Sequence, residues 1–111
     1  MSDAQVSTLE TLIDIITETA APEQIILFGS RARCAPDPES DYDLLVVVSD
    51  VQNERQVSRR IYRALLEHGI AVAADIVVVD RETLEQHRDT PGMIYREALT
   101  EGEVAYDRAR V

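Results

Sequence analysis

The chain has 111 residues, 45% of them hydrophobic, which is enough for a single domain over 1–111 with a modest core. Its 21 acidic and 11 basic residues give a formal net charge of −10, which excludes direct nucleic-acid binding by phosphate neutralisation. No segment is apolar enough to span or target a membrane, and the lone Cys34 excludes an internal disulfide, so we expect a soluble, cytoplasmic protein.

The first two predicted elements are a helix and a strand. Ser7 and Glu10 form a capping box ahead of apolar residues at helical spacing, which predicts a helix over 7–20. The short apolar run 24–28 is rich in residues that favour strands. It predicts a buried strand.

A turn suited to phosphate follows this strand. Gly29 lets the backbone approach an anion closely, and Ser30 supplies a hydroxyl and an N–H at the start of a short predicted helix over 30–33. Every basic residue in the chain is arginine, so a side-chain clamp on phosphate must be a guanidinium. Arg31 and Arg33 are the nearest candidates.

Two aspartates open the next predicted strand. Prolines in the loop 34–40 prevent regular structure, and the chain re-enters a strand over 41–48. Because strand side chains alternate, Asp41 and Asp43 share one face, whereas Tyr42 turns to the opposite side. Paired carboxylates beside a phosphate site favour Mg²⁺, or a similarly hard cation, over zinc.

A third carboxylate, Asp75, lies inside the apolar run 70–79, which predicts a third strand. A lone carboxylate is costly to bury unless it meets a metal or a donor, and two-metal chemistry needs such an acid. The serine turn ends one strand while Asp41 opens the next, so these strands must be antiparallel if the two groups are to meet. We therefore predict an α+β fold with a mixed sheet, helices mainly on one face, and the site open on the other.

The rest of the chain predicts three helices and an edge strand. The helix expected from Asn53 to Gly69 carries four arginines on one face. This face is expected to be exposed to solvent and balanced by acids such as Glu67, rather than to contact a nucleotide or a partner. Apolar residues of the last helix, Met93 and Tyr95 among them, are candidates for a partner surface. The helices are expected from Asn53 to Gly69, over 81–88 behind Asp80, and over 91–101 behind Thr90, and the strand over 104–106.

The segments 28–33 (FGSRAR) and 40–44 (SDYDL), with 74–77 (ADIV), resemble the minimal nucleotidyltransferase domains of the DNA polymerase β-like superfamily. Within that superfamily the chain resembles MntA-type antitoxins paired with HEPN (HepT-type) ribonuclease toxins. The resemblance covers most of the chain, from about Leu9 to Tyr106. It implies a polymerase β-like nucleotidyltransferase fold.

The resemblance also implies a role for each matching residue. Gly29 and Ser30 would hold the nucleoside triphosphate, Asp41 and Asp43 would bind two Mg²⁺ ions, and Asp75 would complete the metal site and help to deprotonate the acceptor. It further implies that AMP moves from ATP to a tyrosine hydroxyl of the toxin, within a hetero-oligomer. Many relatives have glycine where this chain has Cys34, so the bend after the short helix is expected to differ.

Two alternatives remain open from the sequence. The chain could be a non-catalytic antitoxin that neutralises a basic ribonuclease by covering it, which its acidic charge favours. It could instead transfer a nucleotide to a small cationic antibiotic, as aminoglycoside nucleotidyltransferases with the same core motif do. The short chain argues against this last alternative, because it offers no second domain to build the antibiotic pocket.

Overall fold

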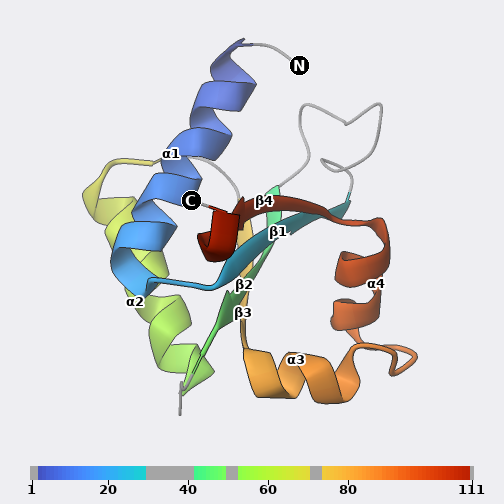
Figure 1. Ribbon diagram of the computed structural model, residues 1–111. Coiled ribbons are helices and arrows are strands. Elements are labelled where there is room, and N and C mark those ends of the chain that lie inside the picture. Colours follow the sequence, from blue (N-terminus) through green and yellow to red (C-terminus); the bar gives the residue numbers. More distant parts are fainter. Residues whose placement is uncertain (1–2, 30–41, 50–52, 71–73, 111) are drawn as a thin grey trace.

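A four-stranded sheet lies between two pairs of helices (Figure 1). The computed structural model describes residues 3–29, 42–49, 53–70 and 74–110. The order of the strands across the sheet is β3-β2-β1-β4. In chain order the elements are α1 (Asp3–Ala20), β1 (Gln24–Phe28), β2 (Tyr42–Val48), α2 (Glu54–Glu67), β3 (Ala74–Asp80), α3 (Arg81–His87), α4 (Ile94–Glu101), β4 (Glu103–Asp107) and the short 3-10 helix η2 (Arg108–Arg110).

The sheet is mixed, as the sequence predicts. Strand β1 pairs antiparallel with both β2 and β4, whereas β2 and β3 are parallel. The expected edge strand after the last helix is confirmed as β4. These pairings confirm the predicted α+β fold class.

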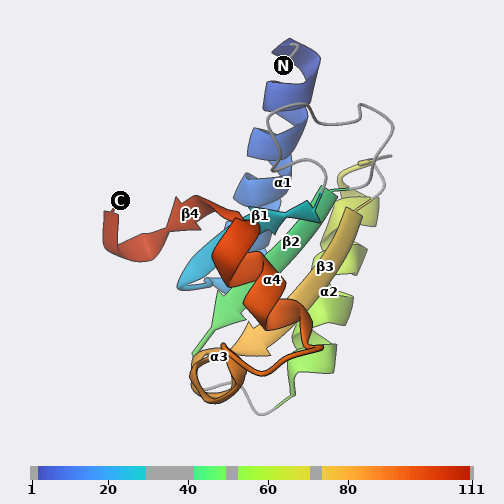
Figure 2. The same cartoon turned by 90° about the vertical axis from the view of Figure 1, so that its right-hand side faces the viewer.

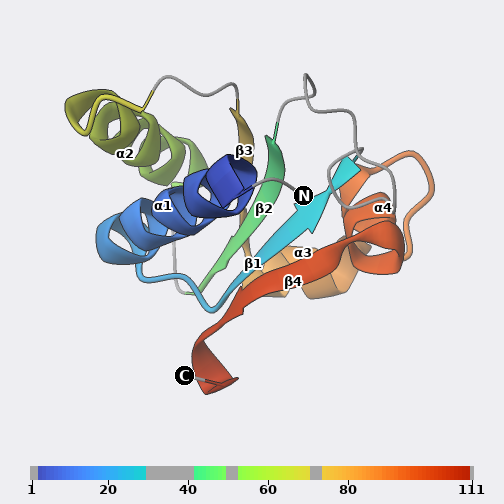
Figure 3. The ribbon, with the colours of Figure 1, turned by 90° about the horizontal axis from the view of Figure 1, so that it is seen from above.

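The first core lies between the sheet and the two longer helices, α1 and α2, which lie side by side over one face (Figure 3). Alternate residues of β2 point into this core, beginning with Tyr42, whose side chain is 4% exposed, so its predicted placement on the side opposite Asp43 is confirmed. The buried residues are Leu12, Ile15, Ile16, Ile25, Leu27, Tyr42, Leu44, Val46, Val48, Val57, Ile61, Leu65, Ile76 and Val78.

A second core lies on the opposite face, beneath the short helices α3 and α4 (Figure 2). The other set of β2 residues, Leu45 and Val47, packs here against Leu84 of α3 and Ala98 of α4. The expectation that this face is open therefore needs correction. Each short helix buries a single residue completely, which is too few to produce a helical period in the sequence.

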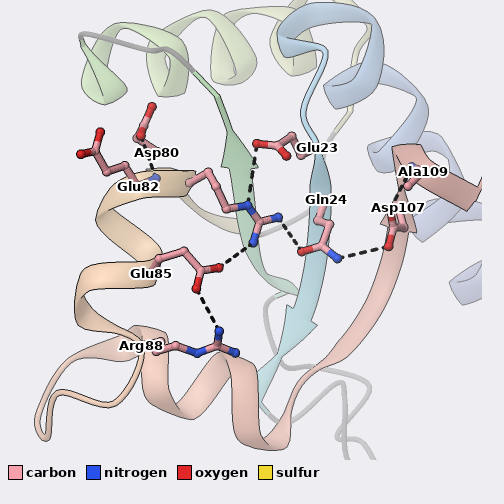
Figure 4. Close-up of polar contacts among 9 residues, drawn as sticks. Glu23, Gln24, Asp80, Glu82, Glu85, Arg88, Asp107 and Ala109 are labelled. Atoms are coloured by element: carbon pink, nitrogen blue, oxygen red, sulfur yellow. Dashed lines mark hydrogen bonds and ion pairs between the residues drawn. The ribbon is translucent and has the colours of Figure 1, made fainter.

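A polar network ties α3 to the strands at the end of the sheet remote from Gly29 (Figure 4). The guanidinium of Arg81 donates to Gln24 Oε1 at 3.0 Å and lies 3.7 Å from Glu23 Oε2 and 3.4 Å from Glu85 Oε1. Gln24 Nε2 then donates to Asp107 Oδ2 at 3.2 Å. The network therefore links α3, β1 and β4 through side chains that are partly exposed.

The predicted starts of two helices, near Asn53 and behind Asp80, are confirmed, and a side-chain cap is found at each. The Asn53 side chain accepts a hydrogen bond from the backbone N–H of Gln56 at 3.1 Å, which starts α2. The Asp80 side chain accepts from the backbone N–H of Glu82 at 2.9 Å and starts α3. Each cap satisfies a backbone donor that has no partner within its helix.

Two other helix starts differ from the prediction. Helix α1 begins at Asp3, so Ser7 lies inside it and is not a cap. Helix α4 begins at Ile94 rather than behind Thr90, because Gly92 has φ of +84°, which is incompatible with a helix. Within the described segments, no helix is both long and apolar enough to cross a bilayer.

We predict that Leu84→Ala destabilises the protein by about 2–5 kcal/mol, because Leu84 is 1% exposed and its removal leaves a cavity in the second core. Leu66→Ala is the matched control, since Leu66 is 78% exposed and its truncation should cost less than about 0.5 kcal/mol. Urea unfolding of both variants measures the difference. Equal losses would mean that α3 does not pack on this face as described.

Candidate active site

Gly29 and Asp43 come together where β1 ends and β2 begins. Phe28, the last residue of β1, is paired with Asp43, so Gly29 follows directly beside the aspartate. Gly29 has φ of +73°, and a Cβ added to it would overlap the Oδ2 atom of Asp43. Glycine is therefore required twice, for its backbone conformation and for the close approach of the carboxylate.

Asp75 lies beside Asp43 on the neighbouring strand. The two residues are direct partners in the parallel pairing of β2 and β3, and adjacent strands are about 4.8 Å apart. Because side chains alternate along a strand, both carboxylates are on the side of the sheet that carries the second core, together with Leu45 and Val77. Asp43 is half-buried and Asp75 is exposed, so solvent reaches this edge.

The remaining predicted site residues lie outside the described part of the chain. These are Ser30, Arg31, Arg33 and Asp41, and their roles stay predictions. Among the described residues, no group of three or more acidic, histidine or cysteine side chains could hold a metal ion. The described part of the site is thus a glycine turn with two neighbouring carboxylates.

No pattern in the sequence predicts the contact that Tyr62 of α2 makes with β3. Its hydroxyl accepts a hydrogen bond from the backbone N–H of Ile76 at 2.9 Å and donates to the carbonyl of Ala74 at 3.3 Å. These two peptide groups flank Asp75 on an edge strand. Tyr62 therefore provides hydrogen-bond partners for the backbone groups on the outer edge of β3, on either side of Asp75.

The mixed sheet brings a glycine turn and two carboxylates together, as the resemblance to nucleotidyltransferases predicts. The family model "Polymerase beta, Nucleotidyltransferase" matches residues 10–110. The chain therefore belongs to the polymerase β nucleotidyltransferase family. A comparison with curated proteins finds no match.

Solved structures support the same fold. A mutant of the toxin–antitoxin MntA–HpeT has a TM-score of 0.63 at 14% identity, with 91% of this chain and 74% of that chain covered. A nucleotidyltransferase from Sulfolobus solfataricus has a TM-score of 0.61 at 23% identity, covering 99% and 92%. A toxin–antitoxin with AMP-PNP has a TM-score of 0.60 at 18% identity, covering 91% and 75%.

We predict that Gly29→Ala destabilises the fold more than Gly69→Ala. Gly69 has a similar φ of +69° with no atom within 4 Å of an added Cβ, so its substitution should cost only the backbone strain, about 1 kcal/mol. Gly29→Ala carries the same strain and must also displace the Asp43 carboxylate, which should add at least about 1 kcal/mol. Chemical denaturation measures both. Equal losses would show that Asp43 does not lie against Gly29.

We also predict that Tyr62→Phe speeds amide hydrogen exchange at Ile76, because the N–H loses its acceptor while the ring is kept. The expected loss of stability is about 1 kcal/mol. Tyr106→Phe is the control, since Tyr106 lies on β4 at the other edge of the sheet. Unchanged exchange at Ile76 in Tyr62→Phe would contradict the contact.

Proposed function

We propose that this chain is a Mg²⁺-dependent nucleotidyltransferase that transfers AMP from ATP to a tyrosine hydroxyl of a partner HEPN ribonuclease toxin. The observation that carries the proposal is the position of Asp43, which touches the Gly29 turn and is paired with Asp75. Membership of the nucleotidyltransferase family supports the class of reaction.

The donor set suits magnesium. Asp43 and Asp75 offer hard carboxylate oxygens from adjacent strands, and Asp41 would add a third carboxylate. Like charges this close repel each other, and a bound cation offsets that cost. Two Mg²⁺ ions held there would supply charge neutralisation for the phosphates and would favour the deprotonated acceptor.

The nucleotide would lie beside the glycine turn. Gly29 would let the backbone approach a phosphate, Ser30 would donate from its hydroxyl and N–H, and Arg31 and Arg33 would clamp the triphosphate. Adenine nucleotide as the substrate is supported by the toxin–antitoxin neighbour whose structure contains AMP-PNP.

In the proposed reaction the acceptor oxygen forms a bond to the α-phosphorus of ATP. The bond from that phosphorus to the bridging oxygen breaks, and pyrophosphate leaves. The hydroxyl proton goes to Asp75, whose exposed carboxylate is accessible to a side chain of another protein. Most of the protein's contribution is positioning of the acceptor in line with the leaving group.

The proposed partner is supported by the net charge of this chain and by the solved structures that share its fold. Two of the solved structures with this fold are toxin–antitoxin proteins. A net charge of −10 suits a basic partner such as the RNA-binding face of a ribonuclease. We infer that this chain is the antitoxin of such a pair.

We predict that purified chain, Mg²⁺ and ATP labelled on the α-phosphate transfer label to the protein encoded beside it. Asp43→Asn and Asp75→Asn should each reduce labelling at least about 100-fold, the scale of losing a catalytic carboxylate. Asp89→Asn is the control, since Asp89 is an exposed carboxylate that follows α3, at a distance from the site. Absence of label with the unaltered chain, or equal label with Asp43→Asn, would contradict the proposal.

A binding-only antitoxin is the second candidate, and one observation favours it. Met93 and Ile94 at the start of α4 are 37% and 38% exposed and line a surface hollow, so they offer apolar area to a partner. Tyr95, named with Met93 on sequence grounds, instead packs partly buried against the second core. Toxin neutralisation that survives Asp43→Asn in the same assay would favour this candidate.

A further inference from the structure

The outer side of α2 carries a row of arginines. Arg55, Arg59 and Arg63 are spaced four residues apart, so they lie on one face of the helix, and all three are exposed. We name them the basic stripe. Within the described segments none of them forms an ion pair, and the expected balance between Arg63 and Glu67 is not observed.

The outer side of α1 carries the opposite charge at the same spacing. Glu10, Asp14 and Glu18 are also four residues apart and exposed, and we name them the acidic stripe. None of their carboxylates forms an ion pair with another described residue. Each stripe is therefore without a charge partner in the described part of the chain.

The two stripes belong to one surface. Helices α1 and α2 lie side by side and run in opposite directions over the same face of the sheet (Figures 1 and 3). Leu12 and Ile16 of α1, like Ile61 and Leu65 of α2, point inward to the first core. The stripes lie on the other sides of these helices and so face outward.

We propose that two copies of this chain associate through the outer surface of α1 and α2, with the acidic stripe of each copy against the basic stripe of the other. A two-fold axis that lies in the contact plane, between α1 and α2, places α1 of one copy over α2 of the second and makes both contacts at once. Because α1 and α2 run in opposite directions (Figure 1), the two stripes of each contact are antiparallel, and the middle residue of one, Asp14, is expected opposite the middle residue of the other, Arg59. The exposed Leu66, one turn beyond Arg63 and Tyr62, adds an apolar contact.

A second copy suits this surface better than nucleic acid does. The net charge of −10 opposes the approach of either partner, but a second copy pairs both stripes at once, whereas a polyanion would leave the acidic stripe without a partner. The surface lies on the face of the sheet opposite Asp43 and Asp75. The association is therefore separate from the proposed transferase reaction.

Sedimentation equilibrium on the unaltered chain tests the proposal. At about 20 mM ionic strength the mass should rise from 12.4 kDa towards twice that value as the concentration increases. At about 500 mM ionic strength the dissociation constant should increase at least tenfold, because salt screens exposed charges. A monomer at every concentration up to about 1 mM, at both ionic strengths, would overturn the proposal.

Charge reversal identifies the surface. Asp14→Arg and Arg59→Glu should each abolish the homodimer, because each places like charges opposite one another twice. An equimolar mixture of the two variants should restore a dimer containing one copy of each, since one stripe contact is then native and the other is reversed in both partners. Asp89→Arg and Arg96→Glu, both exposed and outside α1 and α2, should dimerise like the unaltered chain.

Several outcomes would overturn the proposal. Dimers that persist in both Asp14→Arg and Arg59→Glu would show that another surface is used, as would a mixture that stays monomeric. Circular dichroism and thermal unfolding check that the variants fold, as expected for exposed positions. If either variant fails to fold, Glu18→Arg and Arg55→Glu form the second pair for the same mixing experiment.

Discussion

Strand β2 is buried on both faces, and its register determines the position of both cores and of the candidate site. Leu44 and Val46 point to α1 and α2, whereas Leu45 and Val47 point to α3 and α4. A slip of one residue would exchange these sets and turn the Asp43 carboxylate into the first core, where an unpaired charge is very costly. The register of β2 therefore determines both the packing of the two cores and the position of the Asp43 carboxylate.

The mixed pairing explains why three segments meet at one edge. Because β1 is antiparallel to β2, the end of β1 at Gly29 lies beside the start of β2. Because β3 is parallel to β2, its start, with Asp75, lies beside Asp43. In a fully parallel sheet Gly29 would lie at the opposite end from both aspartates. The shorter connection joins the antiparallel strands β1 and β2, and the longer one, which contains α2, joins the parallel strands β2 and β3. Together they bring Gly29, Asp43 and Asp75 to the same end of the sheet.

The strands and most helix ends could be predicted because their signals are local. The apolar run of β1 and the Asp80 cap act through residues within a few positions, and both predictions are confirmed. The predicted start of α4 is wrong, and the reason is also local. The cap signal at Thr90 and the proline signal at Pro91 favour an earlier start, whereas the conformation of Gly92 prevents it. The roles of the site residues stay predictions, although the structure brings Gly29, Asp43 and Asp75 to one edge.

Helix α2 shows why the remaining contacts could not be predicted. Its buried side is set by the apolar period that includes Ile61, which the sequence displays directly. The Tyr62 hydroxyl meets β3 only because the folded helix lies beside that edge, and in the sequence Tyr62 is just an aromatic residue on a polar face. Tyr62 and Arg63 are adjacent, so one turn of α2 both holds the strand that carries Asp75 and presents a charge to solvent. A partner bound to the outer side of this turn would therefore contact the helix that fixes the edge of β3.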